Sequence, residues 1–130
     1  MNRITKILSL SLILSLTLLF ACKKDKDAPS NNMHKVVFKA IGSTGTKISN
    51  AVYTDGSGKA ETFTSLNTQN WTSNEYTIPS SAHAVSFGVS GTGVDANSTL
   101  VVEIWIDGVK AADGKSTGKI LSPSASITFK

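Results

Sequence analysis

The sequence contains few of the residues that build metal sites and disulfides. Of its 130 residues one is cysteine, Cys22, and two are histidine, His34 and His83. A single cysteine excludes an internal disulfide, a cysteine-based zinc site and an iron–sulfur cluster. Each histidine lies on or beside an expected strand with no His, Cys or Glu at a metal-ligand spacing, which indicates a surface or strand-edge role. We therefore expect neither a metal nor another cofactor.

Basic residues are scarce outside the N-terminus. The formal net charge is +4, and five of the 13 Lys and Arg residues lie within the first 26 positions. Residues 34–130 contain eight Lys against seven Asp and Glu, which leaves a net charge of +1. A nucleic-acid-binding face needs basic residues clustered on the folded domain itself. The sequence thus argues against a nucleic-acid partner, and its length is that of one domain.

The one long hydrophobic run lies at the N-terminus. Residues 1–6 carry Arg3 and Lys6, and residues 7–20 are uncharged and rich in Leu and Ile. This order is typical of the n-region and h-region of a secretory signal peptide. The 14 uncharged residues would rise about 21 Å as a helix, less than the ~30 Å hydrocarbon core of a membrane. We therefore expect a cleaved signal peptide over residues 1–21; an uncleaved anchor is the alternative.

The residues that follow the hydrophobic run form a recognisable motif. Leu19–Cys22 has an apolar residue, a small alanine before the expected cut and the sole cysteine after it, and it resembles the lipobox of bacterial lipoproteins. The resemblance implies that Cys22 is the mature N-terminus and carries a diacylglyceryl group, which anchors the protein in the cell envelope. Lys23 stands where the inner-membrane retention signal of enteric bacteria has Asp, which favours the outer membrane. An ordinary soluble secretory protein is the alternative.

Residues 22–33 are the predicted link between the lipid anchor and the folded domain. Lys23–Asp27 is charged throughout, and residues 28–32 are polar or small apart from one proline. A segment of this composition cannot bury itself, so we expect a flexible tether. It resembles the charged stretches behind the cysteine of surface-exported lipoproteins, and a solvated linker explains it equally well. The periplasmic or surface face of the membrane stays open, and the folded domain is expected over residues 34–130.

From His34 onward the apolar residues alternate with polar ones, and no long helical period occurs. Alternation over four to eight residues is typical of half-buried strands. The expected strands are 35–41, 47–54, 59–66, 75–78, 84–90, 99–106, 109–112 and 124–129. Seven or eight short strands in 97 residues predict an all-β fold, a small antiparallel β-sandwich, with a closed barrel as the alternative.

Two stretches predict which side chains are buried and where the chain turns. Residues 84–90 place Val85, Phe87 and Val89 on one face and small or polar residues on the other, so we expect the first three in the core. Asp107-Gly108 separates two apolar runs. This dipeptide readily supplies the positive φ angles of a type I′ turn, which predicts a tight hairpin there.

Several short segments of the domain also resemble a known family. They are His34–Phe38, Gly42–Gly45, Val52–Asp55, Trp71-Thr72 and Ile104–Val109 with the later Gly118. Together they are similar to the extracytoplasmic domain of the mycobacterial membrane protein small (MmpS) family. The resemblance implies an immunoglobulin-like β-sandwich, with Trp71 in the core, that serves as an accessory to large resistance-nodulation-division transporters exporting lipids and siderophores. This chain differs from the family in its lipobox and in lacking a late cysteine pair.

The sequence contains no recognisable catalytic set. Residues 116–119 match the bare S-x-x-K pattern of serine acylases, but they lie in a glycine-rich connection without the accompanying motifs. The loops 55–58 and 95–97 lack the alternating acidic series of a dedicated calcium loop, and Asp with Gly is ordinary turn chemistry. We therefore expect a non-enzymatic protein.

The candidate binding face is the outer side of the strand 99–106. Leu100, Val102, Ile104 and Ile106 are expected to be buried, which turns Glu103, Trp105 and Asp107 outward. An outward tryptophan suits contact with a protein or a sugar, or it covers a neighbouring strand. The first hypothesis is a lipid-anchored envelope accessory or adaptor that binds a transporter or another envelope protein. The alternative is a surface carbohydrate-binding module with Trp105 and Tyr53 as its platform.

Overall fold

The computed structural model describes residues 33–130, which lie within one compact unit, Asn31–Lys130. The predicted signal peptide, the lipidation of Cys22 and the tether lie outside the described residues. Within residues 33–130 the regular elements are strands, and no helix there is long and apolar enough to cross a membrane.

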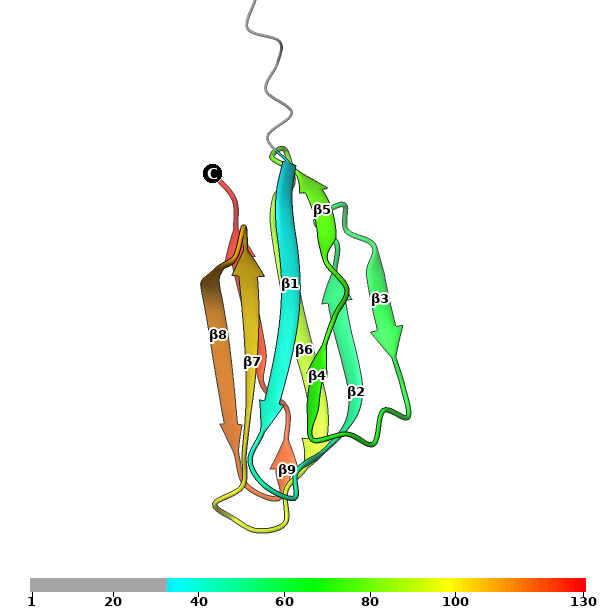
Figure 1. Cartoon of the computed structure of the whole chain (residues 1–130), viewed down its shortest axis with the longest axis vertical. Helices are drawn as coiled ribbons and strands as arrows, with labels where there is room; N and C mark the ends of the chain where they lie inside the picture. Colours follow the sequence, from blue (N-terminus) through cyan, green and yellow to red (C-terminus); the bar gives the residue numbers. More distant parts are fainter. Residues whose placement is uncertain (1–32) are drawn as a thin grey trace, which may run out of the picture. The chain divides into compact units, whose positions relative to one another are not determined.

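The described chain forms ten strands, and the predicted all-β fold is confirmed. They are β1 Met33–Gly42, β2 Lys47–Thr54, β3 Ala60–Phe63, β4 Asn70–Thr72, β5 Tyr76–Pro79, β6 Ala84–Thr92, β7 Thr99–Ile106, β8 Val109–Thr117, β9 Ile120–Leu121 and β10 Ser124–Thr128. Figure 1 shows that β1 begins, and the chain ends, at the same end of the molecule.

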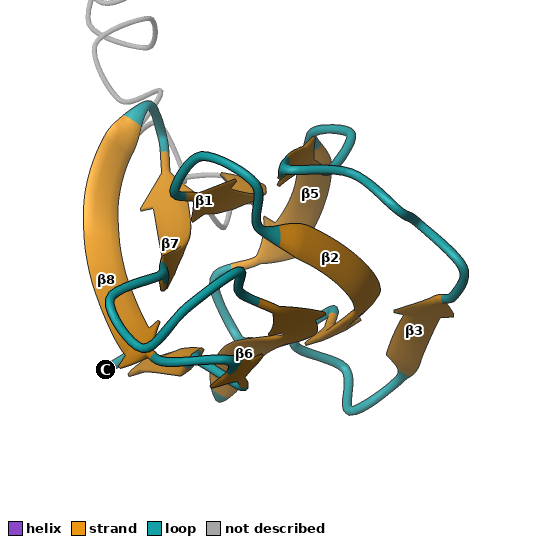
Figure 2. Ribbon diagram, turned by 90° about the horizontal axis from the view of Figure 1, so that it is seen from below, coloured by secondary structure: helices purple, strands orange, loops and turns teal. Residues whose placement is uncertain are grey.

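The strands form two five-stranded antiparallel sheets that pack face to face as a β-sandwich (Figure 2). Sheet A has the order β4-β1-β7-β8, and β5 pairs with the same edge of β1 as β4 does. Sheet B has the order β10-β6-β2-β3, and β9 pairs with one end of β6. Strands β1, β2, β6 and β7 therefore lie in the interior of the sheets, where both of their edges are paired.

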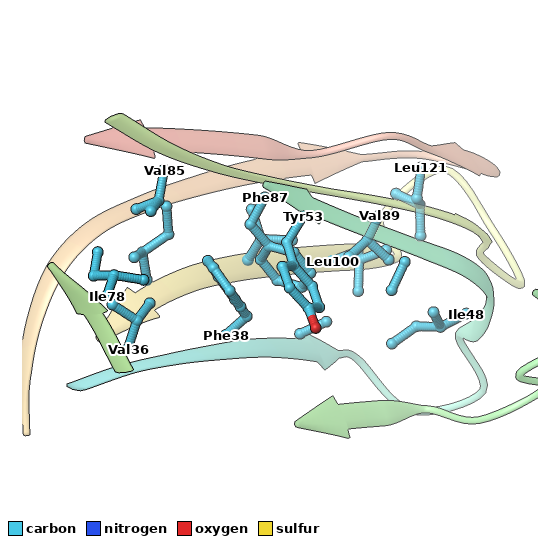
Figure 3. Packing of buried hydrophobic residues seen from close by; sticks show 14 of the residues in the cluster. Val36, Phe38, Ile48, Tyr53, Ile78, Val85, Phe87, Val89, Leu100 and Leu121 are labelled. Atoms are coloured by element: carbon cyan, nitrogen blue, oxygen red, sulfur yellow. The ribbon is translucent and has the colours of Figure 1, made fainter. Parts of the chain in front are cut away.

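Alternating apolar residues from both sheets fill the space between them (Figure 3). Val85, Phe87 and Val89 are at most 4% exposed, as predicted, whereas the residues between them face solvent or are half-buried. Aromatic rings cross the middle of the core: the Phe38 ring lies 4.6 Å from that of Tyr53 and 5.2 Å from that of Phe87, measured between centroids. Burial of such rings supplies most of the driving force for packing the two sheets.

Trp71, expected in the core, is half-buried at its margin. Its ring stacks on Phe87 with centroids 5.7 Å apart and contacts Phe63 at 5.2 Å. The short strand β4 holds it there by pairing Trp71 with Ala40. The tryptophan thus covers the open side of the core between β1 and β3.

The predicted hairpin between β7 and β8 is confirmed. Asp107 has a φ of 51° and Gly108 a φ of 81°, which are the two positive angles of a type I′ turn. The backbone N–H of Asp107 also donates to the carbonyl of Lys35 at 2.8 Å. The turn is therefore fastened to the start of β1.

The two sheets approach each other closely where β8 passes β10. A Cβ on Gly114 of β8 would collide with the carbonyl oxygen of Ser124 at the start of β10. Only glycine permits two backbones to approach this closely. Gly114 therefore closes one side of the sandwich.

Candidate functional site

Trp105 and Glu103 lie on the outer face of sheet A, as predicted, and they contact each other. The indole Nε1–H of Trp105 donates to Oε2 of Glu103 at 2.7 Å. The ammonium of Lys39 lies 4.0 Å from the centroid of the Trp105 ring, and that of Lys110 lies 3.7 Å from Oε1 of Glu103. We call these four residues the Trp105 cluster. They hold the indole in one orientation with its ring half-buried.

Strand register brings the four side chains of the Trp105 cluster together. Lys39 of β1 is directly opposite Glu103 of β7 in the strand register, which places both side chains on the same face next to Trp105. A β-bulge shifts the pairing of β7 with β8, so that Trp105 is opposite Lys110 and Ala111 is left without a partner. The lysines come from strands far apart in sequence, and the simple alternation within β7 does not reveal them.

A shallow groove of about 250 Å³ runs beside the Trp105 cluster. It is lined by Lys35, Val37, Lys39, Glu75, Trp105 and Gly108. Val37 is opposite Trp105 in the strand register, so the apolar part of the groove is the contact between β1 and β7. The groove thus combines an apolar floor, an aromatic wall and lysines at its border.

Asp107 does not join the Trp105 cluster through its carboxylate. Oδ2 lies 2.8 Å from Nδ1 of His34, and Oδ1 accepts the backbone N–H of Lys35 at 2.9 Å. The hydrogen bond from His34, followed by that from Lys35, holds the pKa of the Asp107 carboxyl below its ordinary value. His34 in turn stacks on Phe129 with ring centroids 5.4 Å apart. Asp107 therefore links the β7–β8 turn to β1 and to the C-terminal segment.

Tyr53, proposed as part of a sugar platform, is a core residue, and that prediction was wrong. Its side chain is 1% exposed, and its hydroxyl donates to Oε2 of Glu61 at 2.7 Å. Burial raises the pKa of the Tyr53 phenol well above its ordinary value, and the hydrogen bonds with Tyr76 and Glu61 add to the shift. Tyr53 lies on the same face of β2 as Ala51, and this alternation in the sequence could have predicted that Tyr53 is buried. Within residues 33–130 none of the aromatic rings that pack on one another packs on Trp105, so the described residues form no aromatic row around it.

The carboxylates of the acidic loops serve as hydrogen-bond acceptors within their own turns. Oδ1 of Asp55 accepts the hydroxyl of Ser57 at 2.6 Å and the backbone N–H groups of Ser57 and Lys59. The hydroxyl hydrogen bond holds the pKa of the Asp55 carboxyl below its ordinary value. Asp95 caps its loop in the same way through the N–H of Asn97. In the described part of the chain no three His, Cys, Asp or Glu side chains are grouped to hold a metal.

The outer face of sheet B, which the sequence reading did not single out, carries small uncharged side chains in rows. The strand register and a hydroxyl hydrogen bond define two rows across four strands, namely Ser124–Gly88–Val52–Thr62 and Ser126–Ser86–Thr54–Ala60. A shallow hollow of about 510 Å³ lies over Gly88, with Asp113 at its border. These two rows offer hydroxyl groups but neither an aromatic ring nor a lysine, and Lys47 lies beyond them at the start of β2, opposite Thr92.

A scan of protein families and a search of curated proteins found no match to the chain. No family is therefore assigned, and the functional case depends on the chemistry of the two outer faces.

Proposed function

We propose that this chain is a non-enzymatic binding protein of the cell envelope, an accessory or adaptor that contacts a protein partner through the outer face of sheet A. The observation that carries the proposal is the Trp105 cluster. A tryptophan on the solvent side of a sheet is held in place by a hydrogen bond to Glu103 and a cation above its ring, and it borders a groove.

The fixed orientation of Trp105 favours binding because it lowers the entropic cost of forming a contact. Tryptophan is among the residues that carry most energy in protein interfaces, since it offers a large apolar area and one donor. A tryptophan that only covered the neighbouring strand would not need to line a groove. The groove places this wall next to Val37 and two lysines, which is the mixed lining of a contact site.

The proposed location of the protein in the cell envelope is based on the N-terminal motif. A lipid on Cys22 would keep the domain at a membrane, with the outer membrane favoured by Lys23. The resemblance to MmpS domains supports a transporter of the envelope as one kind of partner. Glycan is the weaker alternative, because the buried Tyr53 removes one of its two aromatic contacts.

The anchor is tested by metabolic labelling with a fatty-acid analogue. The wild-type protein should carry the label and sediment with membranes. Cys22→Ser should abolish the label and release the protein, because the thiol is the only site of attachment that the motif offers. Labelling that is unchanged in this variant would refute the lipid anchor and leave the binding face untouched.

The binding face is tested by cross-linking in intact cells, followed by identification of the captured molecules. An adaptor should capture an envelope protein, and Trp105→Ala should weaken capture by ~1 to 3 kcal/mol, as truncation of an interface aromatic does. Val101→Ala, on the same face of β7 but outside the groove, is the matched control and should capture normally. A folded Trp105→Ala protein that captures its partner normally would refute this site, and capture of glycan alone would favour the alternative.

A further inference from the structure

We infer that the groove beside Trp105 receives an extended acidic segment of the protein partner, with one carboxylate at Lys39 and an apolar side chain two residues away against Val37 and Trp105. This inference rests on the proposed function, and it specifies the chemistry of the partner. It follows from the lining of the groove and from the way in which charges are paired around it.

The groove is arranged for alternate side chains of an extended chain. Lys35, Val37 and Lys39 are successive residues on the outer face of β1, so their Cα atoms follow one another at about 7 Å. Residues of a bound extended segment that point the same way have this spacing too. A segment lying along β1 therefore meets a cation, an apolar surface and a second cation in turn.

Of the two lysines in the groove, Lys39 forms no ion pair within the described domain and is available to bind an anion. Glu75 lies 3.2 Å from the ammonium of Lys35, and Glu103 is occupied by the Trp105 indole and by Lys110. Among residues 33–130 no carboxylate forms an ion pair with Lys39. Its ammonium lies over the Trp105 ring instead, where it keeps N–H donors for an incoming oxygen. The groove thus provides a cation next to an aromatic wall without a matching anion.

This balance favours a protein segment over other anionic ligands. The charged residues that line the groove or belong to the Trp105 cluster are three lysines and two glutamates, an excess of one positive charge. The nearby carboxylate of Asp107 is occupied by His34 and by the backbone N–H of Lys35. Nucleic acid and anionic membranes are bound by several cations acting together. One cation beside an apolar floor fits one carboxylate attached to an apolar chain.

The test uses two synthetic probes, the capped peptides Gly-Leu-Gly-Glu-Gly and Gly-Leu-Gly-Gln-Gly, in which the leucine and the acidic or amide side chain point the same way when the chain is extended, and the full-length protein with nitrogen-15 in its indole groups. The Glu peptide, added to about 10 mM, should shift the Trp105 indole resonance. The resonance of Trp71, which packs on Phe63 and Phe87 at the core margin, should stay in place as the internal reference. The Gln peptide should bind at least about tenfold more weakly, the loss expected for a missing charge-assisted hydrogen bond.

Two lysine variants separate this inference from the proposed function. Lys39→Gln should lose at least about tenfold in affinity for the Glu peptide. Lys115→Gln makes the same change of net charge on β8 outside the groove and should not lose affinity. Equal binding of both peptides, no shift of Trp105, or unchanged binding by Lys39→Gln would each overturn the acidic partner. If Trp105→Ala still weakens capture in cells in that case, the proposed function stands with a different partner chemistry.

Discussion

The outer faces of the two sheets are built on similar antiparallel pairing, but they carry different chemistry. On sheet A the rows across β1, β7 and β8 bring together opposite charges and a tryptophan, as in Lys39–Glu103 and Trp105–Lys110. On sheet B the rows across β10, β6 and β2 bring together hydroxyl groups, a glycine and Val52. A sheet needs only solvent-compatible residues on its outer side, and the uncharged rows of sheet B meet that need.

The comparison identifies what is special about sheet A. Its outer face orders long side chains, which lose rotamer freedom when they are fixed in a cluster. Exposed ion pairs contribute little stability to offset this loss of side-chain entropy. Trp105 is held by a hydrogen bond and by a cation over its ring, and the ordering of this cluster supports the proposed binding role, whereas the small side chains of sheet B have little freedom to lose.

The largest effect should come from a residue that points inward from sheet B, compared with its outward neighbour. Phe87→Ala should destabilise the protein by about 3 to 5 kcal/mol, because it leaves a cavity beside Phe38 and Trp71. Ser86→Ala should stay within about 0.5 kcal/mol, since the hydroxyl lies on the exposed face and its hydrogen bond with the Thr54 hydroxyl is open to solvent. Urea unfolding of both variants gives the difference directly. Equal effects would show that the two faces of β6 are assigned incorrectly, and with them the comparison.

The next largest difference in stability is expected between alanine substitutions at two glycines, Gly114 and Gly88. Gly114→Ala should cost about 1 to 3 kcal/mol, because the added methyl group meets the backbone of Ser124. At Gly88 the nearest atom to an added Cβ is 3.8 Å away and φ is not positive, so neither space nor backbone requires glycine. Gly88→Ala should therefore stabilise the protein by about 0.5 to 1 kcal/mol. The urea midpoints decide, and a destabilised Gly88→Ala protein would mean that the hollow on sheet B is needed for the fold.

The ion pairs of sheet A should respond to salt, and the hydroxyl rows of sheet B should not. Glu103→Gln keeps an acceptor for the Trp105 indole but removes the charge that faces Lys110. We expect a loss of about 0.5 kcal/mol at low ionic strength that disappears in high salt. Ser126→Ala on sheet B is the control, and its small effect should be the same at both ionic strengths. A salt-independent loss at Glu103 would assign its role to packing rather than to charge.

Alternation in the sequence predicted the strands that have one buried face. The bounds expected for β2 and β7 agree with the structure, because β7 alternates between core and solvent along most of its length and β2 resumes its alternation after a bulge between Ile48 and Asn50. The expected strand 109–112 was too short, since β8 continues to Thr117 through polar residues and Gly114. That extension is held by pairing with β7 and not by burial of its own side chains. β4 and β9 are three and two residues long, too short to show a period.

The candidate site was predictable only where it lies on one strand. The outward positions of Glu103 and Trp105 follow from the alternation of β7. Lys39 and Lys110 join them through register and a bulge, which a single sequence does not display. Asp107 was assigned to the same face by continuing the alternation beyond the strand. The period of two ends at the turn, where positive φ angles redirect the side chain toward His34.

The smallest expected effect concerns the carboxylates in the hairpin turns of the two sheets, Asp107 in sheet A and Asp55 in sheet B. Hydrogen bonds lower the pKa of each carboxyl group in the folded state, with His34 as the main cause for Asp107 and Ser57 for Asp55. A lowered folded pKa stabilises the protein above the unfolded value of about 3.9, and this contribution is lost as the pH falls through the folded pKa. Both turns should therefore weaken only below about pH 4.

His34→Ala distinguishes the two turns. Removing the imidazole should raise the pKa of Asp107 toward its ordinary value, while the N–H of Lys35 still donates to the carboxylate and keeps part of the shift. The pKa of Asp55 should not change, because Ser57 and Lys59 hold that carboxylate without His34. Carboxyl carbon resonances followed by NMR from neutral to acidic pH measure both values in one sample. If the pKa of Asp107 is the same with and without His34, the backbone of Lys35 alone fixes this turn, and the contact between the start of β1 and the hairpin of sheet A does not depend on the imidazole.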